Sequence, residues 1–316
     1  MSTVIRPMTE SDLPAARRIC GTAFGTFLEA PEPENFWTDR DYVYGRFGAD
    51  HVASFTAELD GEVVGSNFAT RWGSVGFFGP LTVRPDLWNR GIAQPLVRAV
   101  TGAFDDWGVS HAGLCTFPHS TKHIHLYNKF GYHPRFLTAI MTAPAPAEAA
   151  GNAKRWSRLS QLSADDCRGA LAACREVAEA LYPGLDLGAE IETVASRDLG
   201  DTLLLWGLAS RLAGFAVCHW GPASEAGEGC CFVKFGAVRP GAQAGEHFAA
   251  LLDSCRALAA SSGMAHLLAG VNLAREEAYR HMRDCGFRAE VQVVTLHRPN
   301  EAAYSRPGLY VLDDWR

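Results

Sequence analysis

The chain of 316 residues carries 29 Lys and Arg against 35 Asp and Glu, a formal net charge of −6, and 47% hydrophobic residues. This length and composition predict about two globular domains. The absence of a Lys/Arg block argues against a nucleic-acid partner, and no apolar run reaches the roughly 20 residues of a membrane span. The N-terminus lacks a signal-peptide core, and the nine cysteines include no C-x-x-C pair, so we expect a cytoplasmic protein.

Strand and helix patterns alternate along the first half of the chain, which predicts an α/β sheet flanked by helices. Asp60-Gly61 lies between two of the strands and is typical of a type I′ hairpin turn. The predicted elements are a strand at 4–6, a helix through Ala23, strands at 52–59, 63–70 and 75–83, a helix at 95–104, a strand at 111–117, a helix around 121–129 and strands from Phe136.

The segment between the 75–83 strand and the 95–104 helix has the features of an anion site. The N–H groups of such a turn converge, and the N-terminus of the helix adds positive potential. Gly91 and Ala93 keep the side chains small where a phosphate must approach the backbone, and Arg90 adds a charged donor. The alternative is a tight strand-to-helix turn that binds nothing.

This segment resembles motif A of the GNAT acyl-CoA N-acetyltransferases, V-x-P-x-x-[QR]-x-x-G-x-[GA]. The match lies at Val83, Pro85, Gly91 and Ala93, and the chain departs from the motif at Trp88. The resemblance implies that acetyl-CoA is the cosubstrate. It implies a coenzyme site formed by Leu81, Thr82, Val83, Trp88, Asn89, Arg90, Gly91, Ile92, Ala93 and Gln94, with Ser120 where many relatives carry an asparagine.

The second half repeats landmarks of the first. Val238-Arg239-Pro240 repeats Val83-Arg84-Pro85 (240 − 85 = 155), and Gly286 repeats Gly131 (286 − 131 = 155). The Ala- and Pro-rich residues 143–154 have a linker composition. We therefore predict an α/β fold of the α+β type, with two tandem GNAT-like domains at 1–142 and 155–316, each a mixed, mostly antiparallel sheet flanked by helices. The elements expected in the second half are a strand near 158–159, a helix near 164–181, a hairpin of 202–206 and 214–218, a strand at 231–238, a helix at 247–261, a strand at 266–271, a helix at 274–283 and a strand at 289–296.

The repeat also indicates which half carries the chemistry. Glu246 and Phe248 are the counterparts of Gly91 and Ala93, and they oppose phosphate by charge and by bulk. The counterpart of Tyr127 is Met282. Tyr127 lies in a segment that resembles the family's L-Y-x-K-x-G-[FY] pattern, which implies that it protonates the departing thiolate. A packing role, with the hydroxyl on a carbonyl group, is the alternative.

The mechanism that the resemblance implies is direct attack of an amine on acetyl-CoA. The N–H groups of Leu81 and Val83 would bind the pantetheine arm and stabilise the oxyanion. Pro80 predicts a bend that separates this strand from the 111–117 strand. We expect Cys115 to pack rather than to carry an acetyl group.

The acceptor is expected to be a primary amine of a small molecule or peptide. An acidic cluster would either favour a cationic acceptor or form a solvated loop; its members are Glu29, Glu32, Glu34, Asp39 and Asp41. No metal is expected, because His119 and His123 lack a third ligand. The competing hypotheses are a non-catalytic acyl-CoA sensor and a mycothiol synthase-like enzyme. A monomer is favoured, because the duplicated chain can cover its own sheet edge.

Overall fold

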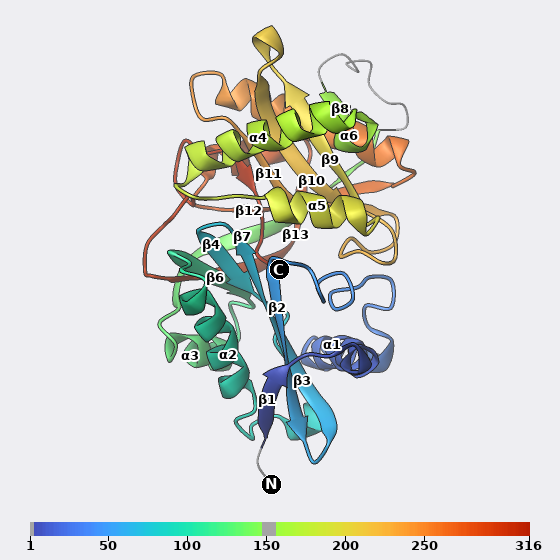
Figure 1. The fold of residues 1–316 in the computed structure, drawn as a ribbon, viewed down its shortest axis with the longest axis vertical. Coiled ribbons are helices and arrows are strands. Elements are labelled where there is room, and N and C mark those ends of the chain that lie inside the picture. The colour runs from blue at the N-terminus through green and yellow to red at the C-terminus, as the bar shows by residue number, and fades with distance from the viewer. Residues whose placement is uncertain (1–2, 147–155) are drawn as a thin grey trace.

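The computed structural model describes residues 3–146 and 156–316, and its helices and strands form two similar halves (Figure 1). Asp60 and Gly61 have φ angles of 53° and 84°, which confirms the predicted type I′ turn between the second and third strands. The first half contains β1 (Val4–Pro7), α1 (Leu13–Phe27), β2 (Val52–Leu59), β3 (Glu62–Trp72), β4 (Val75–Phe78), β5 (Thr82–Val83), α2 (Ala93–Asp106), β6 (His111–Thr116), α3 (Thr121–Asn128) and β7 (His133–Pro144).

The second half follows the same order with two elements that the sequence did not predict, the helix α5 and the short last strand β14. Its elements are β8 (Trp156–Arg158), α4 (Ala164–Leu181), α5 (Gly188–Ser196), β9 (Gly200–Trp206), β10 (Leu212–His219), β11 (Cys230–Val238), α6 (Ala244–Ser261), β12 (His266–Asn272), α7 (Glu276–Asp284), β13 (Arg288–Arg298) and β14 (Val311–Leu312).

The strands of both halves join in one 14-stranded sheet of order β1-β2-β3-β4-β6-β13-β7-β12-β11-β10-β9-β8, with β5 on β3 and β14 on β11. The two halves exchange a strand at its centre. β13 of the second half lies between β6 and β7 of the first, and β7 lies between β13 and β12. β7 includes residues 143–144 of the predicted linker, and residues 147–155 lie outside the described residues.

Helices cover both faces of the sheet in each half, because successive side chains of a strand point to opposite faces. In the first half, Phe68 packs against α1, whereas the neighbouring Ala69 belongs to an apolar cluster that contains residues of α2 and α3. In the second half, Phe215 packs against α4 and α5, whereas Ala216 packs against α6 and α7. α1 and α2 therefore lie on opposite sides of the strands that carry the motif segment (Figure 1).

The C-terminal end lies at the centre of the molecule, between the two halves (Figure 1). Buried Arg275 binds Asp313 at 2.5 Å, and Tyr304 donates a hydrogen bond to the same carboxylate at 2.6 Å. Trp315 then covers Gly113 of β6, where a Cβ atom would lie 2.1 Å from the indole ring. The last residues thus extend from the second half onto the first.

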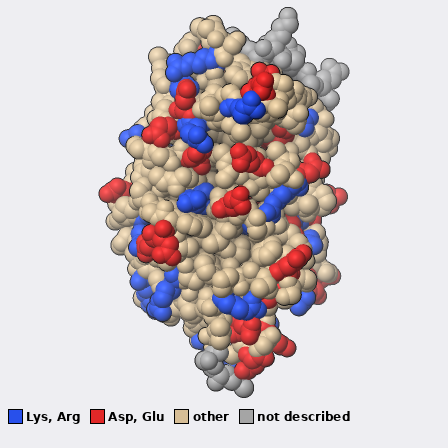
Figure 2. Space-filling model, in the orientation of Figure 1, with Lys and Arg blue, Asp and Glu red and all other residues tan. Residues whose placement is uncertain are grey.

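Charges of both signs are interspersed on the face of the molecule that Figure 2 shows. Among the helices of the described residues, none combines the length and the apolar character needed to cross a membrane.

Replacing Gly113 tests the packing of the C-terminal end on the first half. In Gly113→Ala, the Cβ atom would collide with Trp315 and would lie 2.8 Å from the carbonyl oxygen of Leu296. We expect a loss of about 1–3 kcal/mol in the free energy of unfolding, measured in urea. The matched control is Gly102→Ala in α2, where a Cβ atom meets nothing within 4 Å. This control should gain about 0.5–1 kcal/mol. An unchanged urea midpoint in Gly113→Ala would contradict this packing.

Candidate active site

The motif strand separates from its neighbour at the predicted position. β4 pairs in parallel with β6 from Val75 and His111 to Phe77 and Gly113, and the pairing ends there. After the break at residues 79–81, the chain continues as β5, which pairs with β3 alone. The predicted bend is therefore confirmed. We call this break in the main-chain pairing between β5 and the end of β6 the slot.

The N–H group of Val83 points toward the slot. Arg84 donates its backbone N–H to the carbonyl oxygen of Val64 on β3 at 2.8 Å. Because successive N–H groups of a strand alternate in direction, the N–H of Val83 points away from β3. Thr82 lies opposite Ser66 of β3, and the two side-chain hydroxyls are 3.0 Å apart. The strand that the sequence assigned to the pantetheine arm thus leaves a main-chain donor on its open side.

The turn that follows presents a group of unused N–H donors. Within residues 3–146 and 156–316, the N–H groups of Asn89, Arg90, Gly91 and Ile92 donate to no protein acceptor. Gly91 has φ of 83°, a conformation that favours glycine, and a Cβ atom there would meet nothing within 4 Å. Arg90 is exposed. The turn ends at Ala93 and Gln94, the first residues of α2.

Lys122 adds a positive charge to this turn, and the sequence analysis missed it. Its ammonium group donates to Asn89 Oδ1 at 2.6 Å from the first turn of α3. A single lysine in the helix 121–129 carries no distinguishing signal in the sequence. Ser120, the predicted coenzyme contact, is the buried N-cap residue of the same helix, and its hydroxyl makes no capping hydrogen bond.

Trp88 supports the turn from inside. Its indole N–H donates to the carbonyl oxygen of Val83 at 2.7 Å, and its ring packs against the apolar cluster that contains Leu87 and Ile92. The indole therefore fixes the start of the turn to the end of β5.

Tyr127 is buried at the inner face of α3. Its ring packs edge-on against Phe78, with the ring centroids 5.7 Å apart. Burial raises the pKa of the Tyr127 phenol well above its ordinary value; the nearby Cys115 raises it further, and the Thr116 hydroxyl lowers it. The phenol therefore keeps its proton across the physiological pH range. Burial also raises the pKa of Cys115 to about 12, which favours the thiol over the reactive thiolate.

The acidic residues before β2 do not form one site. Asp41 is buried and accepts the backbone N–H groups of Val43 and Tyr44, each at 2.7 Å. Asp39 pairs with Arg40 at 2.9 Å, which lowers the pKa of Asp39. Glu29, Glu32 and Glu34 are exposed. The solvated-loop alternative fits these last three residues, whereas the two aspartates have structural partners.

The counterpart of the slot in the second half is filled by the protein itself. β11 runs without a break where the first half has β4 and β5 (238 − 83 = 155). β14 pairs with it at Gly236 and Ala237, the counterparts of Leu81 and Thr82. Asp313, the residue after β14, donates its N–H to Gly270 of β12 at 2.9 Å. A strand of the chain therefore lies where the first half has an open edge.

The counterpart of the turn has a different backbone conformation. α6 begins at Ala244, the counterpart of Asn89, so the residues that form the open turn in the first half are helical here. His247 donates its N–H to Gln243 at 2.9 Å. The hydroxyl of Tyr310 would lie 3.1 Å from a Cβ atom on Gly245, and the ring of Phe248 lies 5.2 Å from that of Tyr310.

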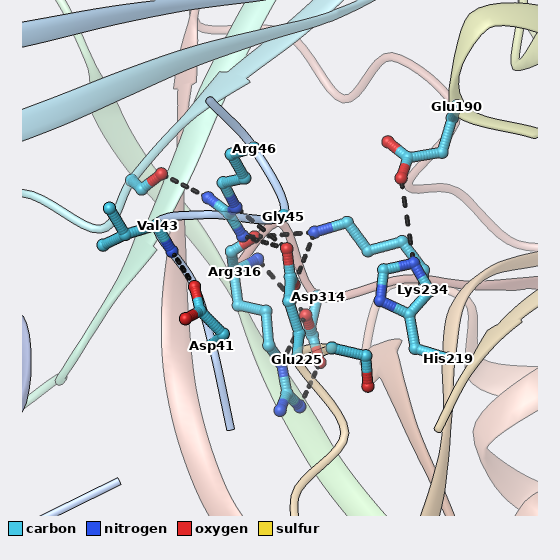
Figure 3. Close-up of polar contacts among 12 residues, drawn as sticks. Asp41, Val43, Gly45, Arg46, Glu190, His219, Glu225, Lys234, Asp314 and Arg316 are labelled. Carbon is cyan, nitrogen blue, oxygen red and sulfur yellow. Dashed lines mark hydrogen bonds and ion pairs between the residues drawn. The ribbon is translucent and has the colours of Figure 1, made fainter. Parts of the chain in front are cut away.

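A buried ion cluster connects the two halves beside the slot (Figure 3). We call it the junction cluster; it consists of Arg46, Glu225, Lys234 and the carbonyl group of Arg316. Arg46 binds Glu225 and Lys234 binds the other oxygen of the same carboxylate, both at 2.8 Å. Arg46 also donates to the carbonyl oxygen of Gly79, at the end of β4. No pattern in a single sequence pairs residues 179 positions apart, so the sequence analysis missed this cluster.

A cavity of about 20 Å³ lies next to the junction cluster, bordered by His51, Glu190 and His219. It is little larger than the roughly 10–15 Å³ that one water molecule occupies, so it is too small for an amine substrate. A larger groove of about 440 Å³ lies on the α1 face, between Ile19 and the end of the motif strand at Arg84. Within the described part of the chain, no group of three or more His, Cys, Asp or Glu side chains could hold a metal ion.

Comparisons with known proteins agree with this architecture. Residues 19–132 match the acetyltransferase (GNAT) family. A proposed acetyltransferase from Pyrococcus horikoshii shares the fold, with a TM-score of 0.67 and 13% identity over 99% of this chain and 95% of that chain. A GCN5-related N-acetyltransferase from Sphaerobacter thermophilus gives a TM-score of 0.62 and 18% identity over 93% and 95% of the two chains.

The structure that contains the glucosamine N-acetyltransferase region of a fungal GH3 β-N-acetylglucosaminidase gives a TM-score of 0.64 and 13% identity, over 94% of this chain and 38% of that chain. A search of curated proteins finds no match. The fold is that of the GNAT acyltransferases, an α/β sheet flanked by helices. The segment that matches the family, residues 19–132, lies within the first half of the chain.

The junction cluster predicts a specific dependence of stability on pH. Burial favours the neutral acid, but Arg46 and Lys234 outweigh it and lower the pKa of Glu225 to about 2. Since the pKa of an unfolded glutamate is about 4.3, this carboxylate stabilises the fold above that pH, and the contribution is lost as the pH falls toward 2. The free energy of unfolding, measured in urea, should therefore fall more steeply from about pH 5 to pH 2 in the wild type than in Glu225→Gln. Parallel profiles would contradict the assignment.

Proposed function

We propose that the chain transfers the acetyl group of acetyl-CoA to a primary amine of a small molecule or peptide, by direct attack in the slot of the first half. The observation that carries the proposal is the contrast between the halves. In the first half, four consecutive N–H groups at residues 89–92 and an edge of β5 have no protein partner among the described residues. In the second half, β14 occupies the edge, and Ala244 and His247 of the counterpart turn donate to Gly241 and Gln243.

The turn would hold the diphosphate of the coenzyme. The free N–H groups of residues 89–92 and the N-terminus of α2 supply positive potential, and Arg90 and Lys122 add formal charge. Gln94 lies in the first turn of α2 beside these donors. Trp88 contributes by fixing the turn to Val83 rather than by touching the phosphates. A larger or acidic side chain in place of Gly91 would keep the phosphates away from all of these groups.

The pantetheine arm would add to the free edge of β5 as a short strand. Leu81 and Val83 would supply main-chain donors, and Thr82 would hold the strand on β3. The same donors would stabilise the oxyanion that forms when the amine attacks the thioester. The buried Ser120 hydroxyl, which has no capping partner, would face the arm from the start of α3.

Tyr127 would protonate the sulfur when the tetrahedral intermediate collapses. The C–N bond forms from the amine lone pair, the C–S bond breaks, and the phenolic proton goes to the thiolate. The proton that the amine nitrogen releases then restores the phenol. The raised pKa of Tyr127 keeps this proton available at alkaline pH. Cys115 would remain a packing residue, because burial keeps it as a thiol.

Replacement of Gly91 tests the coenzyme site. Gly91→Glu should abolish the binding of CoA in calorimetry, because it places a carboxylate among the phosphate donors. Gly91→Ala should weaken binding less, since it adds strain without charge. The matched control is Gln243→Glu, which adds the same charge to the counterpart turn and should leave the affinity unchanged. One full-strength site in Gly91→Glu would place the coenzyme in the other half.

Replacement of Tyr127 tests the chemistry. Tyr127→Phe should keep the affinity for CoA and lower the turnover number about 10²- to 10⁴-fold. Turnover would be measured with a panel of amines that includes polyamines, amino acids, peptides and glucosamine, the last because of the shared fold of the fungal region. An unchanged rate in Tyr127→Phe would remove the acid role. CoA binding without turnover of any amine would favour the acyl-CoA sensor.

A further inference from the structure

We propose that Arg46 is a positioning residue through which the second half holds the bend of the motif strand. Glu225 orients Arg46 (Figure 3). Arg46 in turn fixes the carbonyl group of Gly79. The inference rests on the proposed function, because the bend matters for catalysis only if the coenzyme binds in the slot.

Arg46 has a defined place because its charge is buried. Its side chain is 6% exposed, so each part of the guanidinium group requires a partner. Nε donates to Glu225 at 2.8 Å, Nη2 donates to the carbonyl oxygen of Arg316 at 2.6 Å, and Nη1 donates to Gly79. The planar group therefore ties one carbonyl of the first half to two acceptors from the far end of the chain.

The Gly79 carbonyl group is where the strand leaves its regular pairing. Gly79 donates its N–H to Phe68 on β3 at 2.9 Å, and it follows Phe78, the last residue of β4. The direction of its peptide plane decides how the chain enters β5. A partner on this carbonyl thus controls where the N–H groups of Leu81 and Val83 point.

Lys234 completes the support from the second half. It is the counterpart of Gly79 in the repeat (234 − 79 = 155), and it neutralises the second oxygen of Glu225 at 2.8 Å. Its ammonium group also lies 5.1 Å from the ring centroid of Phe77 on β4. Gly79, at the bend in the first half, and Lys234 therefore occupy equivalent positions in the repeat. Lys234 is a cation that supports the bend.

Two variants of Arg46 test the proposal in the full chain. Arg46→Met removes all three donors, whereas Arg46→Lys keeps a charge for Glu225 but cannot reach three acceptors in one plane. Both should lower kcat about 10²-fold, because a small misplacement of reacting groups costs about that much. The dissociation constant of CoA should rise less than in Gly91→Glu, since the turn at 89–92 is untouched and only the donors to the pantetheine arm move. Arg46→Lys should lose less thermal stability than Arg46→Met.

The matched control is Arg158→Lys, which alters an ion pair with Asp201 of 2.9 Å inside the second half, away from the slot. It should keep kcat. Hydrogen exchange of the peptide 79–84 supplies a readout that needs no acceptor, and exchange should be faster in Arg46→Met than in Arg158→Lys.

Wild-type kcat in both Arg46 variants would overturn the inference, as would unchanged exchange of peptide 79–84. A kcat that falls only in parallel with thermal stability, in Arg158→Lys as well, would reduce Arg46 to a structural role and overturn it too. If Gly91→Glu and Tyr127→Phe lose function while the Arg46 variants do not, the proposed function stands and this inference fails. If Gly91→Glu still binds CoA, the proposed function fails first.

Discussion

The pairing of β4 with β6 ends at Phe77 and Gly113, and the proposed function depends on that end. Two neighbouring parallel strands normally satisfy each other's main-chain groups along their length. Here the motif strand turns away at residues 79–81 and leaves donors on an open edge. A coenzyme arm with amide groups can satisfy those donors, and the turn of free N–H groups lies directly after them.

The second half shows the same fold without a break in the corresponding strand. Its motif strand does not break, β14 occupies the free edge, and the helix begins four residues before the position at which α2 begins in the repeat (93 + 155 − 244 = 4). After β14, the chain continues as Asp314, Trp315 and Arg316, which lie against the first half. We infer that the second half serves as a support, which the exchange of β7 and β13 joins to the first half in one sheet.

Much of the fold could be predicted because its signals are local. Asp60-Gly61 determines a turn, Pro80 excludes a regular strand, and the spacing of 155 residues between the repeats carries over to the start of β6 and β12 (266 − 111 = 155). The turn with unused N–H groups was predictable for the same reason, since Gly91 and its neighbours lie within one segment. α5 was missed because a helix of Gly188–Ser196 follows a longer helix and carries no strong start signal.

The remaining features depend on contacts that no local pattern encodes. The strand exchange places β13 beside β6, and Arg46 meets Glu225 only after the whole sheet has formed. Lys122 of α3 binds Asn89, which lies before α2 and far from Lys122 in the sequence.

The most direct test of the account is hydrogen exchange with and without CoA. The account predicts protection of residues 81–92 and none of residues 236–247. Protection of the later segment alone would contradict it.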